Sequence, residues 1–200
     1  MDFFSKLSYK IGDNLVRSNV IEEEDAEIYI YGINQILVSI LNISSALIIG
    51  WIFGVLLEMV VFMAAYIPLR SFAGGYHAKT PLRCYIFSVI MLILVSVLIK
   101  YQFMSDAVCY AIFAGAVLII FIFSPIEDKN KPLDKIEQKI YKERVFMIGI
   151  AELVICLVLR LINFNNLFIA ITYSFVMLSI MIIIGKIKNI LTLIKIINMK

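Results

Sequence analysis

Long apolar stretches separated by short polar segments run through most of this chain, and their lengths predict membrane-spanning helices. A helix needs about 20 apolar residues, within a range of ~17–25, to cross the hydrocarbon core of a bilayer. The stretch 33–69 is nearly uncharged and too long for one span, so we divide it into two that turn near Gly50–Gly54. Further spans are expected at about Cys84–Lys100, Ala107–Ser124, Val145–Asn163 and Leu167–Gly185. The pattern therefore predicts six transmembrane helices.

The composition supports a membrane protein. Of the 200 residues, 62% are hydrophobic, and a soluble domain of this size has too much surface to hide so many apolar side chains. No internal repeat or low-complexity tract divides the chain. We therefore expect one all-α, polytopic integral membrane domain over residues 1–200, with no cofactor and no nucleic-acid partner.

Residues 1–32 are expected to lie outside the bilayer on the cytoplasmic side. Apolar residues recur there at helical spacing, namely Phe3, Phe4, Leu7, Ile11 and Leu15. With Lys6 and Lys10 among them, they predict an amphipathic helix that lies on the inner leaflet. The open alternative is a docking face for a partner helix.

Positive charge fixes the expected orientation. Sixteen of the 18 Lys and Arg residues lie in the four segments 1–32, 70–84, 125–144 and 186–200. In the six-span arrangement, the hairpins 33–69, 84–124 and 145–185 leave all four segments on one face. Because cytoplasmic loops carry an excess of Lys and Arg, both termini and the segment 70–84 are expected in the cytoplasm.

The loop 125–144 begins with an irregular stretch that contains two prolines, and charges of mixed sign follow at helical spacing. Such a loop is typical of a solvated cytoplasmic connection that fixes topology. The alternative is a surface that binds an acidic peptide segment.

The polar segment "RSFAGGYHAKTPLRC", residues 70–84, holds the chain's one histidine and one of its three cysteines. Gly74 and Gly75 favour a bend after the preceding helix. Pro81 disfavours a helical Thr80, which makes Thr80 the expected N-cap and Pro81 the first residue of the next helix. The fold-back would bring His77 close to Cys84, which lies in or just after the first turn of that helix.

This placement suits nucleophilic chemistry. A helix N-terminus and nearby cations, here Lys79 and Arg83, favour the thiolate, which is the reactive form of cysteine. A histidine within reach can take the thiol proton and return it to a leaving amine. The alternatives are a packing or acylated cysteine beside an ordinary loop histidine. One His and one Cys make a poor metal set, so no metal site is expected.

The same residues carry a resemblance. "RSFAGGYHAKTPLRC", followed by a span pair and then "SP…NKPL", is similar to the AgrB family, the membrane peptidases of Gram-positive peptide quorum sensing. The resemblance covers nearly the whole chain: its length, the amphipathic N-terminus, six hydrophobic segments, the Gly-Gly-x-His-x6-Cys core and the Lys-Pro loop.

The resemblance implies a cysteine endopeptidase in the cell membrane, with its active site facing the cytoplasm. It would act on an AgrD-type propeptide and would work as a homodimer. It also implies that Cys84 is the nucleophile and His77 its base. Arg70 and Gly75 match positions around the family's site, and Lys129 and Lys131 match its basic cytoplasmic loop. Gly74, Lys79 and Arg83 are supporting candidates on the local grounds given above.

Glu152 is expected inside the fifth span, where an acidic residue suggests function. It could orient His77 or pair with a polar group in the bundle. Two rival interpretations of the chain remain, a small-peptide transporter and a non-catalytic membrane scaffold.

Overall fold

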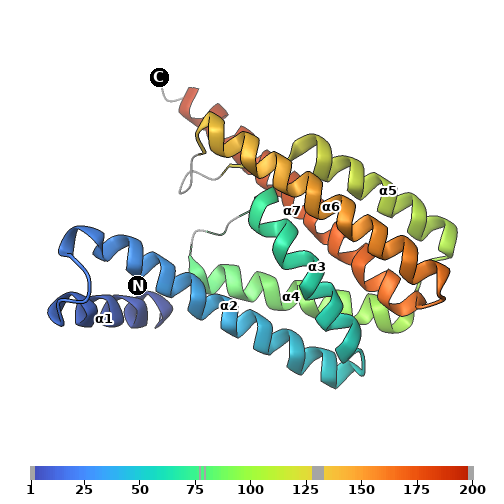
Figure 1. Cartoon of the computed structure of the whole chain (residues 1–200), viewed down its shortest axis with the longest axis horizontal. Coiled ribbons are helices and arrows are strands. Elements are labelled where there is room, and N and C mark those ends of the chain that lie inside the picture. Colours follow the sequence, from blue (N-terminus) through green and yellow to red (C-terminus); the bar gives the residue numbers. More distant parts are fainter. Residues whose placement is uncertain (1–2, 77, 79, 128–132, 198–200) are drawn as a thin grey trace.

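The computed structural model describes residues 3–76, 78, 80–127 and 133–197, and within them the chain is helical apart from its connections (Figure 1). The helices are α1 (Phe3–Arg17), the short 3-10 helix η1 (Glu23–Asp25), α2 (Ala26–Phe53), α3 (Leu56–Ala73), α4 (Pro81–Tyr101), α5 (Asp106–Phe123), α6 (Lys135–Leu161) and α7 (Asn165–Ile197). The prediction of an all-α membrane protein is confirmed.

In the described part of the chain, five helices are long and apolar enough to cross a membrane, namely α2, α3, α4, α5 and α7. The remaining predicted span, Val145–Asn163, coincides with the second half of α6, which ends at Leu161, two residues before the predicted end. This helix is more polar than the others because it carries Arg144, Glu152 and Arg160. It nevertheless packs against α3 and α7 as part of the same bundle.

Helix α7 is the central element of the bundle. In its span, 67% of the residues are buried inside the molecule, against 33% or less in the other four. Tyr173, Met177 and Met181 belong to a core cluster that α2, α3 and α4 share. Phe175, Leu178 and Ile182 belong to a second cluster, formed with α3, α5 and α6. The two sets lie on different sides of α7, because residues three or four apart share a helix face.

Polar residues join the helices at one end of the bundle. Arg160 at the end of α6 forms a 3.0 Å ion pair with Asp106 at the start of α5. Asn166 at the start of α7 accepts a hydrogen bond from Gln102 and donates one to Glu58 of α3, at 2.9 and 3.3 Å. Gly54, with φ +71, ends α2 and allows the turn into α3 that the sequence predicted.

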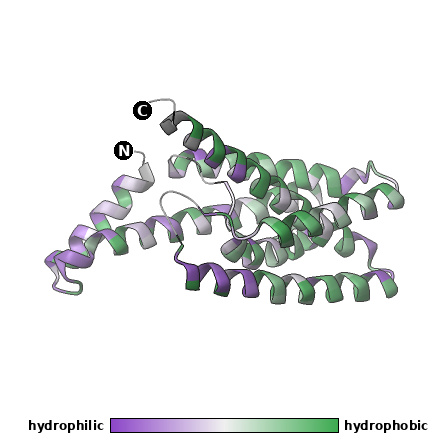
Figure 2. Ribbon diagram, turned by 90° about the horizontal axis from the view of Figure 1, so that it is seen from above, coloured by the Kyte–Doolittle hydropathy of each residue, from purple (hydrophilic) through white to green (hydrophobic). Residues whose placement is uncertain are grey.

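The opposite end holds the segments that the sequence assigned to the cytoplasm. The end of α7, the start of α6, helix α1 and the connection from α3 to α4 lie there together (Figure 1). Hydrophilic residues gather on α1 and on the first turns of α6 (Figure 2). Helix α1 packs along α2 through its buried Ser8 and through Gly12, which lies against Ile30. Its contact with the inner leaflet stays a prediction.

Candidate catalytic site

Cys84 lies in the first turn of α4, as the sequence predicted. Thr80 has the extended backbone of an N-cap, and its Oγ1 accepts a 3.3 Å hydrogen bond from the amide of Arg83. Pro81 follows at the start of the helix, and the Cys84 amide donates to the Thr80 carbonyl at 3.1 Å. The Cys84 side chain is partly buried, whereas Arg83 is exposed. The thiol therefore lies at the positive end of α4.

Arg70 comes from the last turn of α3 and holds the segment that leads to His77. Its Nη2 donates a 2.8 Å hydrogen bond to the carbonyl of Tyr76. One turn earlier on α3, the Tyr66 hydroxyl is a hydrogen-bond partner of Arg70. The sequence interpretation missed Tyr66, although its spacing of four residues from Arg70 places both on one face of the helix.

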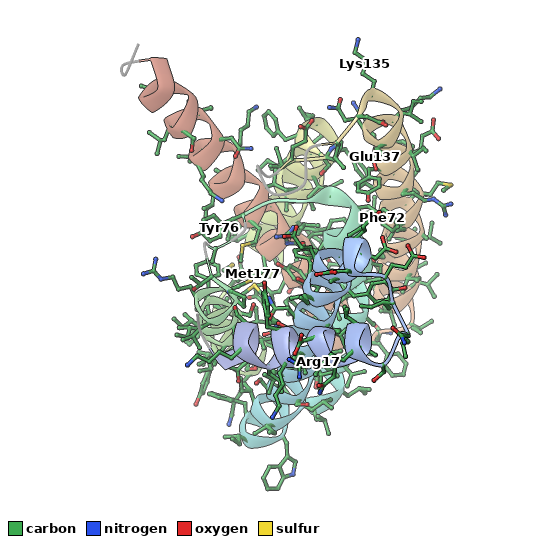
Figure 3. The ribbon with its side chains drawn as sticks, turned by 90° about the vertical axis from the view of Figure 1, so that its left-hand side faces the viewer. Arg17, Phe72, Tyr76, Lys135, Glu137 and Met177 are labelled. Atoms are coloured by element: carbon green, nitrogen blue, oxygen red, sulfur yellow. The ribbon has the colours of Figure 1, made fainter. Side chains whose placement is uncertain are left out.

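Tyr76 is fixed against two helices. Its amide donates a 2.9 Å hydrogen bond to the carbonyl of Met181 in α7. Its ring lies 5.8 Å from the ring of Phe87 in α4, and the Lys188 ammonium lies 5.4 Å above it. Phe87 follows Cys84 by three residues, a spacing that places both on the same side of α4. Figure 3 shows Tyr76 between the ribbons of α4 and α7 with Met177 near it, whereas Phe72 lies on the side of α6, where its ring contacts Tyr141.

The two glycines adopt backbone conformations that other residues rarely reach. Gly74 ends α3 with φ +70 and ψ −151, and Gly75 has φ +125. Gly74 lies directly against the carbonyl of Ile126, and a side chain at Gly75 would come within 3.1 Å of the Met181 carbonyl. The predicted bend is confirmed, and both positions require glycine for conformation and for space.

The residues that follow α5 form a backbone contact with the end of α3, which the sequence did not indicate. The amide of Ile126 donates a 2.9 Å hydrogen bond to the carbonyl of Ala73, beside Gly74. The next residue, Glu127, accepts hydrogen bonds from Asn189 of α7 and Gln138 of α6. The beginning of the loop 125–144 is thereby joined to the candidate site.

Four of the predicted site residues, His77, Lys79, Lys129 and Lys131, lie outside the described residues, and their roles stay predictions. Glu152 is buried in α6, one turn before Cys156. The Cys156 thiol lies 3.9 Å from the carbonyl of Phe168, which is ~20 Å along α7 from Met181. Glu152 is therefore deep in the bundle, not beside Tyr76, and its Oε2 has no hydrogen-bond partner among the described residues.

Comparison with known proteins gives one consistent result. The profile of the family "AgrB: Accessory gene regulator B" matches residues 5–183. A protein of Clostridium perfringens strain SM101 described as AgrB-like is 31% identical over 184 residues, which are 87% of this chain and 82% of that protein. A second from C. perfringens strain 13 is 31% identical over 59% of this chain, a match that spans 58% of its own length.

A third protein described as AgrB-like, from Listeria monocytogenes strain HCC23, is 27% identical over 72% of this chain and 71% of its own length. No solved structure matches.

Proposed function

Because the chain belongs to the AgrB family, we propose that it is a membrane cysteine endopeptidase that matures a quorum-sensing propeptide. One observation carries this proposal. The thiol of Cys84 lies at the N-terminus of α4, and Tyr76, the residue before His77, packs on the same side of that helix through Phe87. Since adjacent residues are ~3.8 Å apart along the chain, His77 is expected within reach of Cys84.

The first step removes the C-terminal tail of the propeptide. The Cys84 sulfur attacks the carbonyl carbon of the peptide bond that precedes the tail, and His77 takes the thiol proton. The carbon–nitrogen bond then breaks, and His77 returns the proton to the departing amine. The products are the free tail and an acyl-thioester between the signal segment and Cys84.

The second step closes the ring. A thiol within the propeptide attacks the thioester carbonyl, gives its proton to His77 and displaces the Cys84 sulfur, which takes the proton back. The result is a thiolactone; a serine hydroxyl in place of the thiol would give a lactone. Exchange of one thioester for another is nearly neutral in free energy, whereas the first step is uphill and depends on release of the tail. Water must be kept away from the intermediate.

The surrounding residues have supporting roles in this mechanism. Arg70 holds the Tyr76 carbonyl and thereby orients the backbone just before His77. Gly74 and Gly75 provide the bend that returns the chain from α3 to α4. Arg83 and Lys79 add positive charge beside the thiolate, and Lys129 and Lys131 contribute to a surface for the peptide.

The proposal includes the setting of the enzyme. The substrate is an AgrD-type propeptide, the active site faces the cytoplasm, and the active form is a homodimer in the cell membrane. The clustering of the site, the start of α6 and the end of α7 at one end of the bundle supports a common cytoplasmic surface (Figure 1).

Mass analysis after co-expression with the propeptide tests the function. Cys84→Ala and His77→Ala should each abolish tail removal while membrane insertion stays normal. Cys109→Ala is the matched control, because Cys109 is also partly buried but lies in α5 near the other end of the bundle. A thioester that is sensitive to hydroxylamine should be trapped on Cys84. Normal maturation by Cys84→Ser would favour the transporter or scaffold interpretation.

A further inference from the structure

The contact between Gly75 and Gly185 brings the backbone of the site segment directly onto α7. Gly185 is buried, and a methyl group added to it would lie 2.8 Å from both the Gly75 carbonyl carbon and the Tyr76 nitrogen. Real side chains essentially never come so close to backbone atoms, so any side chain at Gly185 must displace the segment.

The contact is reciprocal and is closed by a hydrogen bond. A side chain at Gly75 would meet the Met181 carbonyl at 3.1 Å. That carbonyl, one helical turn before Gly185, accepts the 2.9 Å hydrogen bond from the Tyr76 amide. The two glycines therefore leave room for a backbone-to-backbone hydrogen bond between α7 and the segment that leads to His77.

We propose that Gly185 is a positioning residue of the enzyme, which sets the distance between His77 and Cys84 by seating the peptide unit Gly75–Tyr76 on α7. Neither residue 185 nor α7 was part of the site expected from the sequence. The inference rests on the proposed peptidase function for its kinetic consequence, but its structural part, the seating of Tyr76 on Met181, holds independently of catalysis.

The chain offers a matched control. Gly115 is also a helical glycine, but a methyl group added to it would meet no atom within 4 Å. Gly115→Ala therefore changes helix propensity in the same way as Gly185→Ala without displacing the site segment.

The experiment measures propeptide cleavage by the full chain in membranes, together with hydrogen exchange of backbone amides. Gly185→Ala should lower kcat by about tenfold or more, because displacement of a catalytic group by up to ~1 Å can cost up to ~100-fold. KM should change by less than about twofold, and Gly185→Val should be worse than Gly185→Ala. Gly115→Ala should match the unmodified chain in both kinetic constants.

Hydrogen exchange keeps the inference testable if Gly185→Ala does not fold. In the unmodified chain the Tyr76 amide should exchange slowly, a result that requires no variant, and in a folded Gly185→Ala chain it should exchange faster. Fast exchange in the unmodified chain would overturn the proposal, as would a Gly185→Ala enzyme with the kcat of Gly115→Ala. Failure of the peptidase function itself would look different, because cleavage would then survive Cys84→Ala.

Discussion

Arg70 and Tyr76 are joined by a 2.8 Å hydrogen bond from the guanidinium to the backbone carbonyl. The bond spans the bend at Gly74 and Gly75, and it fixes the position at which the chain leaves α3. A hydrogen bond from a charged group contributes roughly 1.5–3 kcal/mol. The bend therefore has an anchor on α3 in addition to the one on α7.

Arg70→Gln should lower cleavage by about 10- to 100-fold, which is the rate equivalent of losing that interaction. The rate of tail removal in membranes is the measurement. Arg17→Gln is the matched control, because Arg17 is exposed on α1 and has no role at the proposed site, and we expect it to lose less than about fivefold, since exposed charges contribute little.

Tyr66→Phe tests whether Tyr66 helps to hold the Arg70 side chain in place. Because the Tyr66 hydroxyl and Arg70 are hydrogen-bond partners, the double variant Tyr66→Phe with Arg70→Gln should lose less than the product of the two single losses. Independent effects that simply multiply would show that Tyr66 does not act through Arg70.

Gly74→Ala should abolish cleavage. The new methyl group would overlap the Ile126 carbonyl, and the backbone at φ +70 and ψ −151 is open to essentially no residue but glycine. Gly54→Ala is the control: it has nearly the same φ of +71, but ψ of 28 lies in the left-handed helical region and no atom lies within 4 Å of the new methyl group. That variant should lose about 1–2 kcal/mol of stability and keep its activity. Equal activity of the two variants would contradict the proposed importance of the Ile126 contact.

Thr80→Ala should loosen the first turn of α4, where Cys84 lies. The capping bond to the Arg83 amide is lost, at a cost of about 1 kcal/mol to the helix terminus. The rate of Cys84 alkylation and the rate of tail removal should both fall, because a looser helix N-terminus favours the thiolate less. Ser105→Ala is the control, because Ser105 occupies the N-cap of α5 without forming a capping bond through its side chain. If both variants behave alike, the cap has no role in presenting the thiol.

The parts of the site that follow local rules could be predicted from the sequence. Thr80, Pro81 and the glycine pair act on the backbone within a few residues, so the end of α3 and the start of α4 were placed correctly. The Val145–Asn163 span was expected from its apolar residues, yet its charges make α6 more polar than the five helices that are apolar enough to cross a membrane.

The contacts of α7 and of Ile126 with the site could not be predicted in this way. Gly185 is 110 positions after Gly75, and nothing in its neighbours "IIIGKIK" distinguishes it from any other glycine of a membrane helix. Its importance depends on which helix packs against which, and that is decided by the whole bundle. The position of Glu152 deep in the bundle could likewise not be predicted from the sequence. It is seen from the contact between Cys156, one turn after Glu152, and the carbonyl of Phe168 near the start of α7.

The orientation of the bundle gives the last prediction, which requires variants with all three native cysteines, Cys84, Cys109 and Cys156, replaced by Ala and one new cysteine each. Phe103→Cys lies in the exposed connection between α4 and α5. Arg17→Cys and Lys139→Cys are exposed on α1 and α6 at the other end. In intact cells, a membrane-impermeant maleimide should label position 103 alone, and permeabilisation should add positions 17 and 139. This follows because positive charge is retained in the cytoplasm. Labelling of position 17 or 139 from outside would place Cys84 on the external face, where a propeptide made in the cytoplasm would have to cross the membrane before it is cut.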